Sequence, residues 1–457
     1  MKLLFSSALL AMVSCSENKI QDDFNGSAAD SYLKAPSKAL TVYNFSVLSC
    51  NVAGLPQILS SATNRDLYTP IIGQKVRDYD IVNVQEDFNY HAALYANDNH
   101  LYRTATTGGA GIGSGLNTMS NFPFSDDIDR VKWTDNSGTD GNNLTPKGFT
   151  WLRIRMSEGV YIDVYNIHTG AGDVDAALDA RRKNIDQIVA YIKANSDGNA
   201  VLIFGDTNCR YSRLGDNIRN IISGLGATDS WVKLIKNGLA PELGSAALVC
   251  DDMATILTSF DCEVVDKIFY RGNNYINLSA LAYTVEDAKF RYTDGSPLSD
   301  HRPVYTKFQY TLNSALRLSD QFGGPHGTSY NDVNSIPSSP MVSKIGIRAA
   351  SRVDQISISL TNGQTFTHGG TGGTANSLTM NTGEYVKSVS ICSDKYNGST
   401  RIFYIKYTTS AGRTLVGGST TSSSVTYAAP AGWQIVGFHG RSGDALDKMG
   451  VIYAPIN

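Results

Sequence analysis

Apolar runs of strand length recur along the first two-thirds of the chain, and most of them end in a short polar cluster. Runs such as Phe45–Leu48, Ile81–Val84 and Ala200–Phe204 are typical of buried strands. After His168 the pattern changes to a helical period, with apolar residues recurring three or four positions apart from Val174 to Ile192. Strands that alternate with helices and long loops predict a layered α/β domain with a mixed sheet.

The pattern changes again near residue 313. From Gly323 onward the helical period almost disappears, and short alternating runs such as Val353–Leu360 and Arg401–Tyr407 are separated by glycine-rich turns. Many short strands of this kind predict an all-β barrel, prism or sandwich. The 457 residues therefore divide into a first domain over 41–312 and a second over 320–457.

The beginning of the chain is typical of a targeting segment. Residues 1–19 combine one early lysine with an apolar core too short to cross a bilayer, which predicts a secretory signal peptide, and 20–40 form a polar leader. The stretch ending at Cys15 also resembles a bacterial lipobox, which would make Cys15 a lipid anchor. Glycosylation sequons instead suit a secreted eukaryotic protein, and they occur at Asn25, Asn44, Asn143, Asn277 and Asn397. We expect a secreted, extracellular protein with no transmembrane segment.

Composition narrows the function classes. A hydrophobic content of 42% and a charged content of 18% describe a globular chain with a core. The net charge of -3, without a long basic run, argues against a protein whose main partner is nucleic acid. Cys250 and Cys262 flank a short segment and could form a loop disulfide, whereas Cys50 and Cys209 are interpreted as small buried thiols. Without a Cys-x-x-Cys pair, a zinc site is not expected.

Five polar clusters carry the candidate chemistry. They are Ser49-Cys50-Asn51, Gln85-Glu86-Asp87, Asn166-Ile167-His168, Gly205-Asp206-Thr207-Asn208 and Ser299-Asp300-His301. Because a sheet brings the ends of several strands together, these residues are expected to share one cleft. Carboxylates, carboxamides and histidines together are what metal-assisted attack on a phosphate requires.

Each of these residue types suggests a role. A divalent cation such as Mg²⁺ or Mn²⁺ prefers hard oxygen ligands, for which Glu86 is the best candidate, with Asn51 nearby. Asp300 could bind the metal or its water. A base that works near neutral pH is by default a histidine, and His301 fits, with Asp266 orienting its ring.

The remaining polar residues fit the reacting phosphate. His168 and Asn208 would stabilise charge on the phosphoryl oxygens, and Asp206 could position the nucleophile or a second metal. The other histidines have no comparable neighbours in the sequence and are expected on the surface or in loops: His91, His100, His326, His368 and His439.

The order of these motifs resembles the endonuclease/exonuclease/phosphatase superfamily over residues 43–310. The resemblance rests on Gln85-Glu86, Gly205-Asp206-x-Asn208, Ser299-Asp300-His301, Asp266 before an apolar run, and Ser114-Gly115-Leu116 followed by Ser120-Asn121-Phe122-Pro123. It implies a four-layered α/β sandwich, magnesium and in-line hydrolysis of a phosphate ester. The family's roles then fall on Asn51, Glu86 and Asp300 (metal), His168 and Asn208 (phosphate), Asp206 (positioning of the nucleophile), and Asp266 with His301 (base dyad).

The substrate is less well defined, because one fold hosts several activities. The segment 51–56 and the Ser-Gly-Leu stretch look most like the secreted sphingomyelinase-type branch, and a secreted DNase-like endonuclease is the alternative. Apolar loop tips that enter a bilayer would separate the two. Phe122, Phe124 and Trp133 are candidates, although burial in the core is the preferred interpretation for them.

The second domain resembles the jacalin-related lectins. Gly440–Gly450 looks like their sugar-binding loop, supported by Gly323-Gly324, Gly369–Gly373 and Gly383-Glu384-Tyr385. The resemblance implies an all-β prism that contacts sugar through Gly323, Asp444, Ala445, Leu446 and Asp447. Where many relatives carry an aromatic residue after Gly443, this chain has Asp444 and Ala445, which removes stacking area; the alternative is a lectin fold that has lost binding.

Together these features predict a secreted, magnesium-dependent phosphodiesterase joined to a carbohydrate-binding module. A phospholipid substrate with peripheral membrane contact is favoured, and nucleic acid is the alternative. A glycan-binding lectin with an inactive first domain is a further alternative. The retained Glu86, Asp206, Asn208, Asp266 and His301 argue against it.

Overall fold

The structure is a computed structural model of the whole chain. It describes residues 41–56, 64–107, 113–138 and 145–456. The predicted signal peptide and leader over 1–40 lie outside the described residues, as do Cys15 and the sequons at Asn25 and Asn143. In the part that is described, no helix is both long and apolar enough to cross a bilayer.

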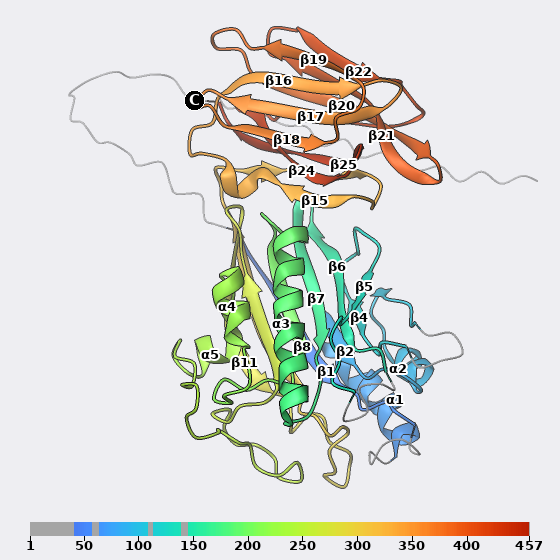
Figure 1. The fold of residues 1–457 in the computed structure, drawn as a ribbon, viewed down its shortest axis with the longest axis vertical. Helices are drawn as coiled ribbons and strands as arrows, with labels where there is room; N and C mark the ends of the chain where they lie inside the picture. The colour runs from blue at the N-terminus through green and yellow to red at the C-terminus, as the bar shows by residue number, and fades with distance from the viewer. Residues whose placement is uncertain (1–40, 57–63, 108–112, 139–144, 457) are drawn as a thin grey trace, which may run out of the picture. The chain divides into compact units, whose positions relative to one another are not determined.

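Two six-stranded mixed sheets form the centre of the first domain over the described residues (Figure 1). The first sheet runs in the order β11 (Ile276–Val285), β12 (Val304–Leu312), β1 (Val42–Asn51), β2 (Ile81–Gln85), β4 (Asn117–Ser120), β3 (Tyr102–Arg103). The second runs in the order β5 (Asp129–Lys132), β6 (Gly148–Ser157), β7 (Val160–His168), β8 (Ala200–Asp206), β10 (Asp266–Arg271), β9 (Thr228–Asp229). The mixed-sheet prediction is confirmed.

Helices cover the outer faces of the two sheets. The helices are α1 (Arg65–Lys75), α2 (His91–Asn97), α3 (Asp175–Asn195), α4 (Arg219–Leu225) and α5 (Ser230–Leu234), with a 3₁₀ turn η1 (Val76–Asp78) after α1. On the first sheet, Ile72 of α1 and Leu94 of α2 pack with Leu48 and Val82. On the second, α3 buries the apolar stripe that its sequence period predicts. The result is the predicted α/β four-layered sandwich.

The two sheets meet across a largely apolar interior that becomes polar toward one end of the strands. Asn83 donates to the carbonyl oxygens of Tyr165 (3.1 Å) and Phe204 (3.1 Å), and Gln85 donates to Asn166 Oδ1 (2.8 Å). These amides are fully buried, so their hydrogen bonds offset the cost of removing them from water. They also fix how the two sheets align just before the predicted site.

The second domain is built almost wholly from strands, as predicted for a prism. Its described sheets contain β13 (Arg317–Leu318), β14 (Phe322–Gly323), β15 (Thr328–Asn331), β24 (Trp433–Ser442) and β25 (Leu446–Pro455); then β16 (Val342–Ala349), β17 (Val353–Leu360), β18 (Thr365–Gly369) and β19 (Thr374–Thr379); then β20 (Val386–Tyr396), β21 (Ser399–Thr409), β22 (Thr414–Gly418) and β23 (Ser423–Ala428). A 3₁₀ turn, η2 (Asp332–Ser335), follows β15. Ile345, Ile356, Ile391, Ile405 and Val451 represent the fully buried core between these sheets.

Polar contacts join the second domain to the hairpin of β6 and β7. Arg153 makes a bidentate ion pair with Asp163 (2.7 and 3.0 Å) and also donates to Ser329 Oγ (2.8 Å). Asp320 accepts from Arg155 (2.8 and 2.7 Å) and from the Tyr161 hydroxyl (2.9 Å). These contacts use the beginning of β7, whereas the predicted site residue His168 is at its end.

Candidate active site

Strand register brings the five polar clusters to one end of the two sheets. The parallel pair β1 and β2 aligns Asn51 with Gln85, the residue before Glu86. The parallel pair β7 and β8 aligns His168 with Asp206, and β10 begins at Asp266 directly opposite Asp206. The segment with His301 precedes β12, which pairs with β1, so it reaches the same end. Strand register therefore places these clusters at the same end of the two sheets, and Asn208, Asp266, Asp300 and His301 line a common cleft there.

The backbone at these strand ends adopts conformations that side chains normally avoid. Ala53, Glu86 and Asn208 have φ angles of 50°, 57° and 48°, in the left-handed region. Gly54 comes so close to Glu86 that an added Cβ would lie 2.4 Å from its carbonyl oxygen. Such residues cost roughly 1–3 kcal/mol each and concentrate at functional sites. This strain is what we expect of a functional site, where the backbone holds polar side chains in a required position and local stability is reduced.

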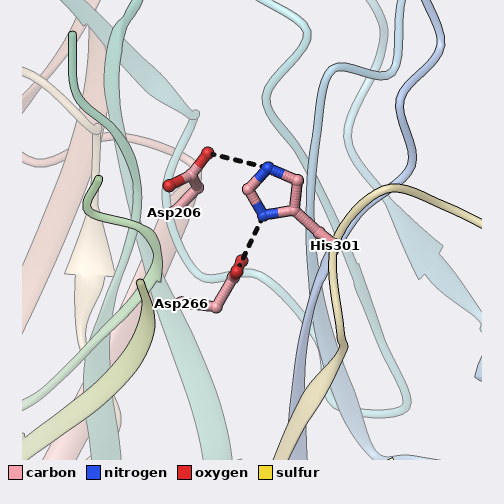
Figure 2. A group of neighbouring side chains, drawn as sticks. All are labelled: Asp206, Asp266 and His301. Atoms are coloured by element: carbon pink, nitrogen blue, oxygen red, sulfur yellow. Dashed lines mark hydrogen bonds and ion pairs between the residues drawn. The ribbon is translucent and has the colours of Figure 1, made fainter. Parts of the chain in front are cut away.

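His301 lies between two carboxylates (Figure 2). Its Nδ1 is hydrogen-bonded to Asp266 Oδ2 at 2.8 Å, and its Nε2 lies 3.7 Å from Asp206 Oδ2. Burial alone would lower the pKa of His301, but Asp266 and Asp206 outweigh it and hold the pKa well above its usual value. Burial raises the pKa of Asp266 despite the neighbouring imidazole. This is the geometry of a histidine base oriented by an acidic partner.

Asp206 is the point where the other side chains converge. Its Oδ2 lies 3.2 Å from Asn51 Nδ2 and 3.3 Å from His168 Nε2, and its Oδ1 accepts from the Asn208 backbone N–H at 2.9 Å. Burial tends to raise the pKa of Asp206, but the neighbouring His301 and His168 lower it overall. Asp206 is therefore an ionised, buried carboxylate at the centre of this group of side chains.

His168 is fully enclosed and differs from His301 in its protonation. Burial, helped by the positive charge of Lys147, lowers the pKa of His168 to about 3. Among the described residues, neither ring nitrogen has a hydrogen-bond partner. A neutral imidazole with unpaired nitrogens, 3.3 Å from the Asp206 carboxylate, is a group that an oxygen atom can complete.

Oxygen donors suited to a cation lie beside this centre. Asn51 Nδ2 is 3.4 Å from Glu86 Oε1, so the side chains of these two residues face one another. Burial raises the pKa of Glu86, and Asp300 is close enough to raise it further. Asp300 itself is exposed. Carboxylates crowded together and desolvated are a donor set that a hard divalent cation relieves, so these residues fit such an ion.

A second grouping of possible ligand atoms overlaps the base. One atom each from Asp206, Asp266 and His301 lie within 4.8 Å of one another, which is also compatible with a metal. His301 Nδ1 is already hydrogen-bonded to Asp266, however, and the dyad leaves Nε2 for a proton. We therefore interpret this trio as acid–base chemistry and the side of Glu86 as the cation site.

Two cations at the site were missed by the sequence reasoning. Lys147 precedes Gly148, which pairs with His168, and its charge bears on Glu86, His168 and Asp206. Buried Arg65 donates to the carbonyl oxygens of Val52 (2.9 Å) and Leu298 (2.7 Å), which ties together two segments far apart in sequence. The run Thr145-Pro146-Lys147 before a strand could have indicated Lys147; nothing local indicates the role of Arg65.

Other expectations are partly corrected. His100 and His439 are buried rather than on the surface: His100 bonds Asp98 (2.5 Å) and His439 bonds Gln321 (2.9 Å). His91 and His368 also have carboxylate partners, Asp87 and Asp332. Folding brings these partners next to the histidines, which the local sequence does not reveal.

Phe122, Phe124 and Trp133 are partly buried against the core, as the preferred interpretation of the sequence expected. Trp133 also donates to the carbonyl oxygen of His168 (2.7 Å).

The cysteine predictions are confirmed. Cys250 and Cys262 form a disulfide. Cys50, Cys209 and Cys392 are free and buried within the described chain, and burial raises the thiol pKa of Cys50 and Cys209 far above its usual value. Inert thiols of this kind take no part in nucleophilic chemistry.

The predicted sugar loops lie together in the second domain. Gly323 pairs with Lys448, and the Gly324 N–H donates to Asp447 O at 2.8 Å. Asp444 is exposed, whereas Ala445, Leu446 and Asp447 are buried and the Asp447 carboxylate is ion-paired with Arg401. Leu446 can therefore offer at most its backbone to a ligand, and Asp447 already has a cationic partner.

Comparisons with known proteins agree with this geometry. Residues 46–307 match the family model described as Endonuclease/Exonuclease/phosphatase family 2, and 319–452 match the Jacalin-like lectin domain. Because the first match spans more than half of the sequence, this chain belongs to the endonuclease/exonuclease/phosphatase family.

Curated relatives include the sphingomyelinases of Mycobacterium tuberculosis strain H37Rv and of Mycobacterium bovis. Each is 36% identical over 283 residues, which are 60% of this chain and 54% of the relative. The chain thus spans about half the length of the curated relatives that it matches.

Solved structures are similar to each domain separately. A beta toxin from Staphylococcus aureus is 17% identical, with a TM-score of 0.40, covering 57% of this chain and 99% of its own. Malaysian banana lectin is 28% identical, with a TM-score of 0.26, covering 30% of this chain and 97% of its own.

Proposed function

We propose that this chain is a divalent-cation-dependent phosphodiesterase that hydrolyses a sphingomyelin-like phospholipid. The observation that carries the proposal is the His301 imidazole, which is hydrogen-bonded to Asp266, lies 3.7 Å from Asp206 Oδ2 and borders an open cleft. A water in that cleft transfers a proton to His301 Nε2 as its oxygen bonds to phosphorus. The bond from phosphorus to the lipid alkoxide breaks in line, and solvent protonates the departing oxygen.

The dyad keeps His301 ready for this step. In the neutral form of His301, which requires the surrounding negative charge to be offset, Asp266 accepts from Nδ1–H and the lone pair of Nε2 is left to take the proton. Asp206, 3.7 Å from Nε2, orients the attacking water through its ionised carboxylate. Positioning of this kind supplies a large part of the rate enhancement in phosphoryl transfer.

A divalent cation is the expected cofactor. Glu86 and Asn51 would hold it, with Asp300 at the same side, because their oxygens suit Mg²⁺ or Mn²⁺. When bound, the cation polarises the phosphate and offsets the negative charge that keeps the pKa of His301 high.

Neutral and cationic donors surround the expected position of the phosphoryl oxygens. His168 has unpaired ring nitrogens, Asn208 Nδ2 lies 3.2 Å from the carbonyl oxygen of the next residue, Thr169, and Lys147 adds positive charge. Donors of this kind stabilise charge that builds in the transition state more than they stabilise the substrate.

The lipid substrate is favoured by two observations. The matched mycobacterial relatives are named sphingomyelinases. The segment from Asn237 to Asp266, which supplies part of the cleft lining, contains no lysine or arginine, whereas a DNase needs cations along the phosphate backbone. Arg210 and Arg302 also line the cleft, and both donate to backbone carbonyl oxygens, of Glu263 and Asp252. A DNase-like activity is the alternative that the assay must exclude.

Secretion and surface targeting form the second part of the proposal. The Cys250–Cys262 disulfide suits an oxidising compartment, and the described sequon residues Asn44, Asn277 and Asn397 are exposed. The jacalin-like match suggests glycan binding through the loops at Gly323 and Asp447. Even weak sugar binding raises the enzyme's concentration at a glycan-bearing surface.

The test compares sphingomyelin vesicles with duplex DNA at matched Mg²⁺, with and without EDTA. We expect phosphocholine release from the vesicles, no DNA cleavage and no release in EDTA. Hydrolysis of DNA alone would overturn the lipid assignment, and an inert wild type would support a lectin with an inactive first domain. For the second domain, Asp444→Ala, which removes the exposed carboxylate of the predicted sugar loop, is expected to lose retention on immobilised saccharides that retain the wild type.

A further inference from the structure

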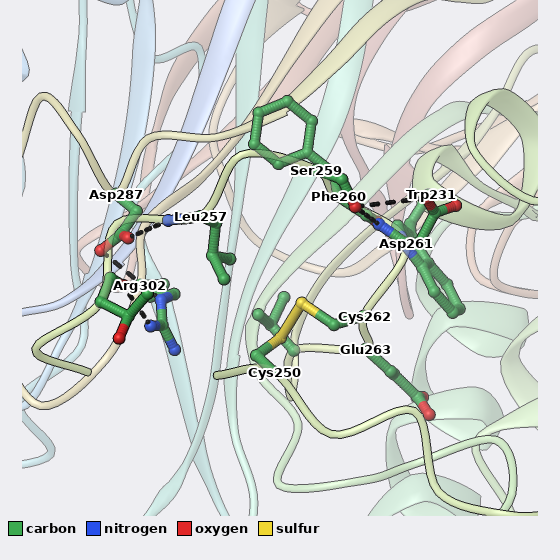
Figure 3. The surroundings of a disulfide bond; sticks show 12 residues. Trp231, Cys250, Leu257, Ser259, Phe260, Asp261, Cys262, Glu263, Asp287 and Arg302 are labelled. Carbon is green, nitrogen blue, oxygen red and sulfur yellow. Dashed lines mark hydrogen bonds and ion pairs between the residues drawn. A yellow bond between two sulfur atoms is a disulfide. The ribbon is translucent and has the colours of Figure 1, made fainter. Parts of the chain in front are cut away.

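An irregular segment beside the cleft is held rigidly without helices or strands. This stapled loop, residues 236–265, connects α5 to β10 and contains the Cys250–Cys262 disulfide (Figure 3). Arginines outside it grip its backbone: Arg302 donates to the carbonyl oxygens of Asp252 (2.8 Å) and Thr255 (3.1 Å). Arg291 reaches Thr255 (3.2 Å) and Ala254 (3.4 Å), and Arg219 reaches Pro241. The conformation is therefore set by the surrounding domain.

Despite this fixed backbone, large apolar side chains of the stapled loop face solvent. Leu239 is 77% exposed, Val249 68%, Leu243 51% and Ile256 46%. Leu214, on the neighbouring loop after β8, is 77% exposed and lies against Gly244, where an added Cβ would be 3.2 Å from its Cδ2. Single exposed apolar residues are ordinary, but several on adjoining loops mark an interaction surface.

This apolar surface adjoins the site. Val249, Cys250 and Met253 line the same open cleft, of about 300 Å³, as Asp266, Asp300 and His301. The residue after the base, Arg302, is also one of the residues that hold the loop. Any external surface that contacts the stapled loop would therefore have its own outermost groups close to the cleft.

The charge of the stapled loop restricts what that surface can be. Between Lys236 and Lys267 the chain has no basic residue. Its exposed charges are all acidic: Glu242, Asp251, Asp252 and Asp261. An anionic membrane or a nucleic acid would be repelled, whereas a zwitterionic surface whose outermost group is a quaternary ammonium would not.

We propose that the stapled loop docks the enzyme on a zwitterionic choline-phospholipid surface, with its apolar side chains entering the interface. The proposal rests on the lipid substrate proposed above and names the element that reaches it. Amphiphilic contacts of this type gain affinity from buried apolar area. The acidic residues then lie among the choline groups while the cleft faces the phosphates.

The test uses the full-length protein in EDTA, so that binding is measured without hydrolysis. Wild type, L239D/L243D, L239M/L243M and the control Leu101→Asp are sedimented with sugar-free phosphatidylcholine vesicles. Leu101 is 78% exposed and lies outside the stapled loop. We expect L239D/L243D to bind at least tenfold more weakly, and the methionine and Leu101 variants to match wild type.

A second readout separates this proposal from the proposed function. With Mg²⁺, hydrolysis of a water-soluble phosphocholine ester is expected to be equal in all four proteins, because neither Leu239 nor Leu243 lines the cleft. Binding that is lost only in L239D/L243D, without any hydrolysis, would support the docking surface and overturn the function. Hydrolysis with equal vesicle binding by all four proteins, or tighter wild-type binding to anionic vesicles, would overturn the docking surface alone.

Discussion

The two ends of the second sheet use the same residue types to opposite effect. At the beginning of β7, Asp163 accepts two hydrogen bonds from Arg153 and one from Ser196 Oγ (2.6 Å), all of them buried. At the end of β7, His168 has no hydrogen-bond partner for its ring nitrogens within the described structure, and neither does Asp266 Oδ1. The Arg153–Asp163 pair is hydrogen-bonded where the domains are joined, whereas the atoms without partners at the other end lie where a substrate would bind. Among the described residues, buried atoms without hydrogen-bond partners also occur near the junction, at Asp126 Oδ2 and His439 Nε2.

This difference indicates what each end is for. A buried ion pair whose donors are hydrogen-bonded holds the structure in one arrangement. Removing one partner of such a pair is strongly destabilising, because the other charge is left buried alone. Unpaired polar atoms and left-handed backbone at Ala53 and Glu86 cost stability, and they persist where function requires them. The comparison predicts that substitutions at the two ends have separable effects on rate and on stability.

The largest effect is expected from His301→Ala at the open end. Loss of the general base is expected to reduce hydrolysis by about 10³-fold, with the melting temperature nearly unchanged. The measurement is phosphocholine release at fixed Mg²⁺, alongside a thermal melt. Exposed His326 offers the control, since His326→Ala should retain full activity. Undiminished hydrolysis by His301→Ala would remove His301 from the proposed role.

At the joined end, Asp163→Ala should act on stability instead. It leaves the guanidinium of Arg153 buried without its carboxylate, which typically costs about 3–5 kcal/mol. The midpoint of denaturant unfolding is expected to fall while the rate per folded molecule is retained. Asp179→Ala, which removes an exposed ion-paired carboxylate, is the matched control and should have little effect. A stable but inactive Asp163→Ala would contradict the division between the ends.

Glu86→Gln sharpens the comparison within the open end. The amide keeps the shape of the side chain but weakens cation binding, so the Mg²⁺ concentration for half-maximal activity should rise by about 10²-fold. Since burial raises the pKa of Glu86, removing its charge should not destabilise the fold. An Mg²⁺ titration followed by a melt tests both points. Unchanged Mg²⁺ dependence would move the cation site elsewhere.

The smallest effect concerns pH and stability. Burial lowers the pKa of His439 to about 3, so below its unfolded value of about 6.5 the unfolded chain binds an extra proton. His439 therefore reduces the free energy of unfolding by about 1.4 kcal/mol per pH unit as the pH falls below about 6.5. His439→Gln should flatten this dependence, measured by urea unfolding at pH 6.5 and 5.5. His326→Gln is the control, and an unchanged slope for His439→Gln would contradict the prediction.

The open end behaves differently under the same change of pH. His168 also has its pKa lowered to about 3, with the same sign as His439. The pKa of His301 is raised, so its contribution is present below about pH 6.5 and is lost as the pH rises through the folded value. The effects of His168 and His301 on the pH dependence of the free energy of unfolding therefore have opposite signs. His439, which lies outside the site, reports this pH dependence more clearly.

The sequence predicted the site residues better than their surroundings. Asn51, Glu86, His168 and Asp206 each end an apolar run, so a sheet was enough to bring them together. Asp266 begins its strand, so it was proposed as the partner of His301 from its chemical role and from the family resemblance rather than from a local pattern. Local patterns could therefore locate the chemistry without giving its geometry.

What the sequence did not predict depends on contacts between distant segments. Arg65 donates to the carbonyl oxygen of Leu298, 233 residues away, and the Nε2 of His100 is hydrogen-bonded to the Tyr79 carbonyl oxygen (2.6 Å). The contacts of Asp320 with Arg155 and Tyr161 likewise exist only once both domains have folded. The left-handed backbone at Glu86 also depends on tertiary context, because a glutamate has no preference for it.

The position of β1 has a consequence for synthesis of the protein. β1 lies between β2 and β12 in its sheet, and Ser49 pairs with Val304. More than half of the chain must therefore be synthesised before β1 can pair with β12. This pairing joins strands far apart in sequence and so has a high contact order. Asp266 and His301 arrive in the same late stretch. We expect the nascent chain to acquire its catalytic dyad only as β12 closes the sheet, so that hydrolysis cannot begin on a half-made molecule.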